Sequence, residues 1–176
     1  MKVKISKMIS NQKLLVVGMI IFAALTRLIP HAPNFTSVGA MALFAGAMWG
    51  LSATTFIVPL AALVLTDLVL GMHSTIFYVY GAFLLISLIG ALSLKKRTGA
   101  RLVGVTLFSS LVFFFITNFG VWMADSLYAH NLAGLTECLV MGLPFLKNQI
   151  LGDVTFSVLM FSAYELLARR FVVAKN

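Results

Sequence analysis

Long apolar runs, broken only by short polar segments, are the feature of this chain that most constrains its fold. Hydrophobic residues make up 61% of the 176 residues and charged residues only 10%, whereas soluble domains are about 45–50% apolar and about 25% charged. So few polar residues could not cover a water-exposed surface around such an apolar interior. The sequence therefore predicts a single all-α, polytopic membrane domain over residues 1–176, because helices satisfy their own backbone hydrogen bonds in lipid.

Six apolar runs can be separated, and we expect each to form a transmembrane helix. A crossing needs about 20 residues at a rise of 1.5 Å per residue. The second run is short and rich in glycine and alanine, which favours packing against neighbouring helices over contact with lipid. The predicted spans are residues 13–29, 38–50, 51–71, 75–94, 100–124 and 149–168.

Most of the basic residues fall in three short polar segments that flank the apolar runs. Positively charged segments of this kind stay on the cytoplasmic side of a membrane. Six spans place all three segments on that side, whereas five would place the first opposite the other two. We therefore expect both termini to lie inside a bacterial cytoplasmic membrane, with no nucleic-acid partner for the +8 charge. The segments contain Lys2, Lys4, Lys7 and Lys13; Lys95, Lys96, Arg97 and Arg101; and Arg169, Arg170 and Lys175.

Three ionisable residues lie inside or at the edge of spans, near their outer ends. Arg27, Asp67 and Asp153 would each be costly against lipid alone. Their similar depth allows Arg27 to pair between the two carboxylates. This cluster is open to two interpretations, a ligand-binding site or an ion pair that only fastens helices. The longest outer segment, residues 125–148, is expected to fold back over the membrane surface as a lid or interfacial helix.

Further polar and aromatic residues lie at the same outer ends. The turn after the first span is dense in such side chains, although a simple proline-bracketed connector is the alternative, and the outer aromatic residues also fit an interfacial belt. Histidines in two outer loops lack a third ligand at a diagnostic spacing, so we expect no metal. The candidate substrate-binding residues are Arg27, His31, Asn34, Phe35, Thr36, Asp67, His73, Tyr78, Asn118, Trp122 and Asp153.

The sequence carries no catalytic signature of the common kinds. Motifs for a serine hydrolase, a zinc peptidase and a phosphate-binding loop are absent. We therefore expect no enzyme activity and no cofactor, and active transport would need a separate motor or an ion gradient. The alternative to a ligand-binding protein is a structural or assembly scaffold. An intramembrane enzyme using Asp67 or Asp153 with a histidine is less favoured, because no spacing supplies a matched partner.

The layout resembles the substrate-binding S-components of ECF-type vitamin transporters. The resemblance lies in Val38-Gly39-Ala40 through Phe44-Ala45-Gly46, in Leu65 to Gly71, and in the Pro30–Thr36 turn, which is similar to one in small bacterial membrane proteins of this kind. It implies an outward-facing pocket for a micronutrient such as a vitamin. The solitary cobalamin-linked S-components are the nearest named group, with His73 as the imidazole best placed for cobalt.

The same resemblance implies an energising transporter module as a partner. In S-components that module commonly meets a small-residue AxxxA motif on the first helix. This chain departs from the pattern, because its first span offers Gly18, Ala23 and Ala24 without such a motif.

Overall fold

The computed structural model describes the backbone of residues 2–173 and the side chains of residues 12–168, and this part of the chain contains helices and no strands. The predicted all-α fold is confirmed. Four helices, α3 to α6, are long and apolar enough to cross a membrane. The elements are α1 (Lys2–Leu25), the 3-10 turn η1 (Thr26–Leu28), α2 (Val38–Trp49), α3 (Ala53–Leu70), α4 (Ile76–Ser93), α5 (Gly99–Ala124) and α6 (Leu132–Val173).

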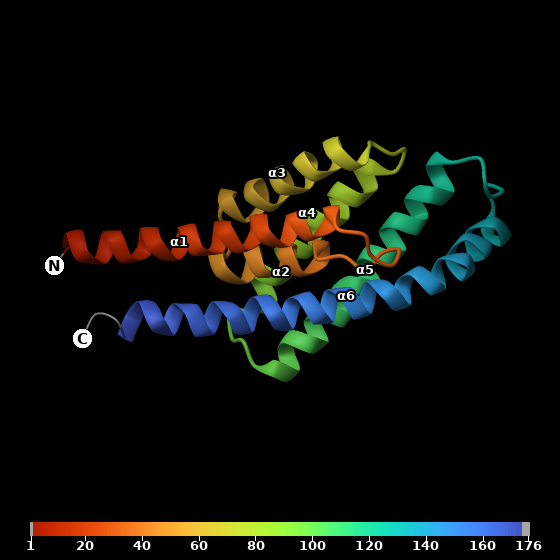
Figure 1. Cartoon of the computed structure of the whole chain (residues 1–176). Coiled ribbons are helices and arrows are strands. Elements are labelled where there is room, and N and C mark those ends of the chain that lie inside the picture. Colours follow the sequence, from red (N-terminus) through yellow and green to blue (C-terminus); the bar gives the residue numbers. More distant parts are fainter. Residues whose placement is uncertain (1, 174–176) are drawn as a thin grey trace.

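Successive helices run in alternating directions (Figure 1). The start of α1 and the end of α6 lie at one end of the bundle, together with the α2–α3 and α4–α5 connections. The opposite end carries residues 26–37, 71–75 and 125–131, and we call it the loop end. The basic segment between α4 and α5 thus lies at the end away from the loop end. The side chains of the basic residues near both termini, Lys2, Lys4, Lys7, Arg169, Arg170 and Lys175, lie outside the described part.

The short helix α2 is the centre of the bundle. Nine of its 12 residues are buried, as expected for a helix that packs on protein rather than on lipid. A side chain at Gly46 would collide with the backbone of α4, and one at Gly90 would collide with Leu43 of α2. These glycines let the backbones of α2 and α4 approach closely. On α6, Phe161 packs edge-on against Phe44 of α2, with ring centroids 5.2 Å apart.

The last helix departs most from the sequence-based prediction. Residues 125–148 do not form a lid that folds back, because α6 already begins at Leu132 and runs for 42 residues. Asn131 caps its first turn by accepting a hydrogen bond from the Gly134 backbone at 2.9 Å. At 1.5 Å per residue α6 is about 63 Å long, roughly twice the hydrocarbon core of a bilayer. The start of α6 and the end of α5 therefore reach beyond the other helices (Figure 1).

Smaller differences concern the helix ends. The first helix was expected over 13–29, but α1 ends at Leu25 and continues as η1 only to Leu28. Thr26 donates a hydrogen bond to the Ala23 carbonyl at 2.6 Å, which satisfies one of the carbonyls left free at the end of α1. This early end turns Arg27 out of the helix and toward α3.

Candidate functional site

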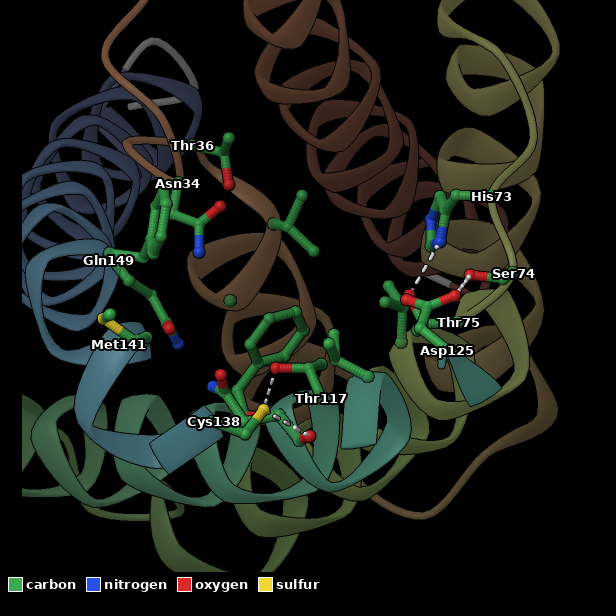
Figure 2. A pocket seen from close by; sticks show the side chains of 18 of the residues that line it. Asn34, Thr36, His73, Ser74, Thr75, Thr117, Asp125, Cys138, Met141 and Gln149 are labelled. Carbon is green, nitrogen blue, oxygen red and sulfur yellow. Dashed lines mark hydrogen bonds between the residues drawn. The ribbon is translucent and has the colours of Figure 1, made fainter. Parts of the chain in front are cut away.

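A cavity of about 550 Å³ lies at the loop end of the bundle. It is an open cavity bordered by η1, the loops that follow α1, α3 and α5, the start of α2, and residues of α3, α4, α5 and α6. Figure 2 shows polar side chains on opposite sides of it, with His73, Ser74 and Asp125 facing the group of Asn34, Cys138 and Gln149 across the space. Its polar lining comprises Arg27, Asn34, Thr36, His73, Ser74, Thr75, Thr117, Asn118, Asp125, Tyr128, Cys138, Gln149 and Asp153.

One wall of the cavity is held by a closed ion pair. Arg27 Nη2 lies 2.7 Å from Asp67 Oδ1, and the other guanidinium nitrogen, Nη1, donates to Thr66. The Tyr80 hydroxyl donates to the second carboxylate oxygen of Asp67 at 3.0 Å. Asp67 is only 2% exposed and does not line the cavity. Both oxygens of this carboxylate are therefore occupied, and the cluster fastens η1 to α3 and α4.

The second buried carboxylate, Asp153, lies in the cavity wall and is 4% exposed. Ser110 of α5 donates to Asp153 Oδ2 at 2.7 Å, and the Gln149 amide lies 3.5 Å from the same oxygen. The expected pairing of Arg27 is therefore confirmed for Asp67 and wrong for Asp153. Arg27 pairs with Asp67, whereas no cation of the described side chains lies within ion-pair distance of Asp153.

Helix α2 begins directly against the Asp153 carboxylate. Its N-cap residue, Ser37, makes no side-chain capping bond, because its hydroxyl donates to the Ala23 carbonyl at 2.6 Å instead. A side chain at Gly39 would collide with the Asp153 carboxylate, so glycine is required for this approach. The N–H groups of a first helical turn have no partner within the helix, and the backbone of Gly39 thus serves as a neutral donor to the Asp153 carboxylate.

The loop between α1 and α2 lies on α6 and brings Asn34 and Thr36 to the cavity. Asn34 adopts a positive φ of 62°, a conformation that asparagine tolerates better than most residues. The Asn148 amide donates to the Pro33 carbonyl at 3.0 Å. A side chain at Gly152 would collide with the backbone of Thr36, so this glycine lets the loop lie directly on α6. The other expected residues of this turn lie elsewhere, with His31 exposed and Phe35 packed on Phe156 at 5.9 Å.

The exposed rim of the cavity joins the α3–α4 loop to the end of α5. Ser74 donates to Asp125 at 2.9 Å, and His73 Nδ1 lies 3.0 Å from the Thr75 hydroxyl. Tyr78 and Trp122 are outside the lining. Tyr78 packs on Gly120, where a side chain would meet its ring, and the Trp122 indole donates to the Ala129 carbonyl at 2.8 Å.

The structure brings together six of the eleven residues expected from the sequence. Arg27, Asn34, Thr36, His73, Asn118 and Asp153 line the cavity, whereas His31, Phe35, Asp67, Tyr78 and Trp122 do not. The sequence-based prediction missed seven further polar residues of the lining, which are Ser74, Thr75, Thr117, Asp125, Tyr128, Cys138 and Gln149.

Helical spacing could have found part of that missed set. Gln149 precedes Asp153 by four positions and therefore shares its helix face. Within the described residues, no group of three histidine, cysteine or acidic side chains could hold a metal ion.

Comparison with known proteins places the chain in a family without supplying a function. No curated protein and no solved structure matches the chain. One family model matches residues 7–174, which is nearly the whole sequence. The chain therefore belongs to DUF6580, a family of unknown function.

Proposed function

We propose that this chain is the substrate-binding membrane protein of a micronutrient uptake system. The observation that carries the proposal is the cavity at the loop end, where polar groups from several helices and loops converge. Its volume of about 550 Å³ lies within the about 300–1,000 Å³ typical of small-molecule pockets. Polar groups buried beside apolar helices are costly unless they are hydrogen-bonded or paired, and ionisable residues within membrane spans often mark functional sites.

The proposed setting is the bacterial cytoplasmic membrane, crossed six times with both termini inside. Lys95, Lys96 and Arg97 lie between α4 and α5, and Arg101 lies in the first turn of α5, at the end of the bundle away from the cavity. Basic segments of this kind favour the cytoplasmic side. The cavity then faces outward, where a scarce nutrient would be captured.

The cavity volume favours a vitamin of moderate size as the ligand. A molecule of that size is enclosed on most sides by a pocket of this volume. Cobalamin is much larger and would bind with only part of its structure inside. His73 at the exposed rim is then the candidate cobalt ligand.

Active uptake requires an energising module or an ion gradient. The small residues Ala23 and Ala24 of α1 are each only 3% exposed, because they pack into the bundle. Gly18 is exposed on α1, and a side chain there would meet nothing within 4 Å. A module that docks on α1 would therefore meet the face around Gly18 rather than the alanines.

The proposal is tested by identifying small molecules that stay bound to gently purified protein. We expect mass spectrometry of the extract to find one retained micronutrient, and the same compound to raise the melting temperature of ligand-free protein. The panel should include cobalamin and the smaller vitamins. Protein that retains nothing and is stabilised by no member of the panel would contradict the proposal.

A structural or assembly scaffold is the second candidate, and the closed Arg27–Asp67 pair favours it. This cluster satisfies its own groups and needs no ligand. Gln149→Leu separates the two functions, because it removes a cavity amide that is 6% exposed. A binding protein should lose uptake or ligand affinity, whereas a scaffold should retain its cellular role as long as the variant folds.

A further inference from the structure

The ionisable side chains that line the cavity give it a negative character. They are the acidic residues Asp125 and Asp153 and the basic residues Arg27 and His73, beside the weakly acidic Tyr128 and Cys138. The charge of Arg27 is already compensated, since Asp67 lies 2.7 Å from its guanidinium. That is the only ion pair among the side chains of residues 12–168. Asp125 and Asp153 thus line the cavity without a cation in ion-pair contact, whereas the guanidinium of Arg27 in the same lining is already paired with Asp67.

The two carboxylates lie at different depths. Asp125 is partly exposed at the rim, where it accepts a hydrogen bond from Ser74. Asp153 is 4% exposed at the inner end, where Ser110 is its donor. Ser110 and Asp125 are separated by about 22 Å along α5 at the helical rise. A positively charged ligand would therefore meet one carboxylate at the entrance and a second at the inner end.

The inner carboxylate lacks the compensation that a buried charge needs. The Ser110 hydroxyl, the distant Gln149 amide and the backbone N–H of Gly39 replace part of the hydration that Asp153 loses on burial, but none of them supplies a countercharge. The groups that face it are the first turn of α2 beside Gly39, the hydroxyl of Ser110 and the amide of Gln149, and none of these carries a formal charge. A cationic group with an N–H or a quaternary nitrogen would supply the missing positive charge.

The rest of the lining suits an organic cation better than a metal ion. Phe113 and Phe145 line the cavity together with Val79 and Val121, and aromatic faces attract organic cations. Thr117 and Asn118 offer neutral polar contacts between the two carboxylates. No cluster of three metal-ligating side chains is present in the described residues.

We propose that the ligand is an organic cation of vitamin size, bearing an ammonium group or a cationic nitrogen heterocycle that binds at Asp153. This inference rests on the proposed binding function and adds the charge class of the substrate. Asp125 at the rim attracts the cation during entry, because exposed charges act mainly on association rates.

The test uses the full-length protein in detergent with one set of cationic and one set of anionic small-molecule probes. Thiamine, choline and pyridoxamine are the cationic probes, and biotin and pantothenate are the anionic ones. We expect at least one cationic probe to bind and neither anionic probe to do so, as measured by calorimetry and by thermal shift. Asp153→Asn should weaken binding of that cation about tenfold or more, as expected for the loss of a buried charge-assisted contact.

Glu137→Gln is the matched control, because it removes one negative charge from α6 at a residue that does not line the cavity. Its affinity for the cation should equal that of the wild type. If Asp153→Asn fails to fold, Asp125→Asn replaces it and should slow association of the cation.

The outcomes separate the two proposals. Binding of an anionic vitamin, or cation binding that neither aspartate variant weakens, overturns the charge class and leaves the proposed function standing. Protein that binds none of these probes, retains no small molecule on purification and is stabilised by no vitamin overturns both.

Discussion

Asp67 and Asp153 are two buried carboxylates on apolar helices, and their surroundings differ in one decisive respect. They are 2% and 4% exposed, respectively. Asp67 has a guanidinium at 2.7 Å and a tyrosine hydroxyl at 3.0 Å. Asp153 has only neutral partners, namely a serine hydroxyl, a distant amide and the backbone of Gly39, and it borders a cavity. Burial alone therefore does not separate the two carboxylates, which differ in whether a cationic partner is present.

The difference predicts opposite responses to substitution. Removing one partner of a buried ion pair leaves the other charge uncompensated. Neutralising a buried charge that has no cationic partner removes a cost and preserves the packing. Stability should therefore depend strongly on Asp67 and weakly on Asp153, while ligand binding should show the reverse order.

Asp67→Ala should produce the largest loss of stability. It leaves the Arg27 guanidinium without its carboxylate and the Tyr80 hydroxyl without its acceptor. The expected cost is about 3–5 kcal/mol in the free energy of unfolding, measured by equilibrium unfolding in mixed detergent micelles.

The double variant Arg27→Met with Asp67→Leu serves as its control. Well-packed apolar residues often replace a buried pair at little cost, so this variant should regain most of the lost stability. If the single and double variants were equally unstable, packing rather than the ion pair would be what matters at this position.

Gly39→Ala should have the next largest effect, and it tests the Asp153 side of the comparison without removing its charge. The new methyl group would collide with the Asp153 carboxylate at the start of α2. Overpacking of this kind costs about 2–3 kcal/mol, and displacement of the carboxylate should also weaken ligand binding. Unfolding and calorimetry on the same sample measure both effects.

Gly81→Ala is the matched control for this glycine. Gly81 also lies within a helix, but a side chain there would meet nothing within 4 Å. Alanine is favoured over glycine in a helix by up to about 1 kcal/mol, so the variant should be as stable as the wild type or slightly more stable. A loss equal to that of Gly39→Ala would mean that helical glycines matter here for a reason other than space.

The sequence predicted the helices of the bundle better than the cavity. Apolar runs and glycine-rich composition are local, so residues 38–50 and 75–94 predicted α2 and α4 closely. The start of α6 was missed because Asn131 is followed three residues later by Gly134 and not by the glutamate or glutamine of a capping box, although its side chain caps the first turn in the structure. The apolar residues that follow it suit a helix as well as an interfacial loop, and the choice depended on that cap.

The partners of the charged residues could not be read from depth alone. Arg27, Asp67 and Asp153 were expected at one level, but depth does not specify which helix faces which. Tyr80 lies on α4 beside α3 and completes the Asp67 cluster, and Ser110 lies on α5 and meets Asp153. These contacts depend on the order of helices around the bundle, which the apolar pattern of each helix does not encode.

Tyr80→Phe should lower the stability less than Asp67→Ala or Gly39→Ala does. It removes one donor from Asp67 while Arg27 keeps its ion pair, so the expected cost is about 1–2 kcal/mol. Because Tyr80 is outside the cavity lining, ligand affinity should be unchanged. A strong loss of affinity in calorimetry would place the Asp67 cluster in the binding site after all.

Asp153→Asn should change stability least, by less than about 1 kcal/mol. The amide has nearly the same shape, and its oxygen can still accept the hydrogen bond from Ser110. Loss of the favourable interaction between the carboxylate and the start of α2 costs about 0.3–1 kcal/mol, and removal of an uncompensated buried charge offsets it. The variant should therefore melt within a few degrees of the wild type, although it binds ligand poorly. A loss as large as that of Asp67→Ala would instead make Asp153 a second fastening group, and the two carboxylates would then differ in their partners but not in their role.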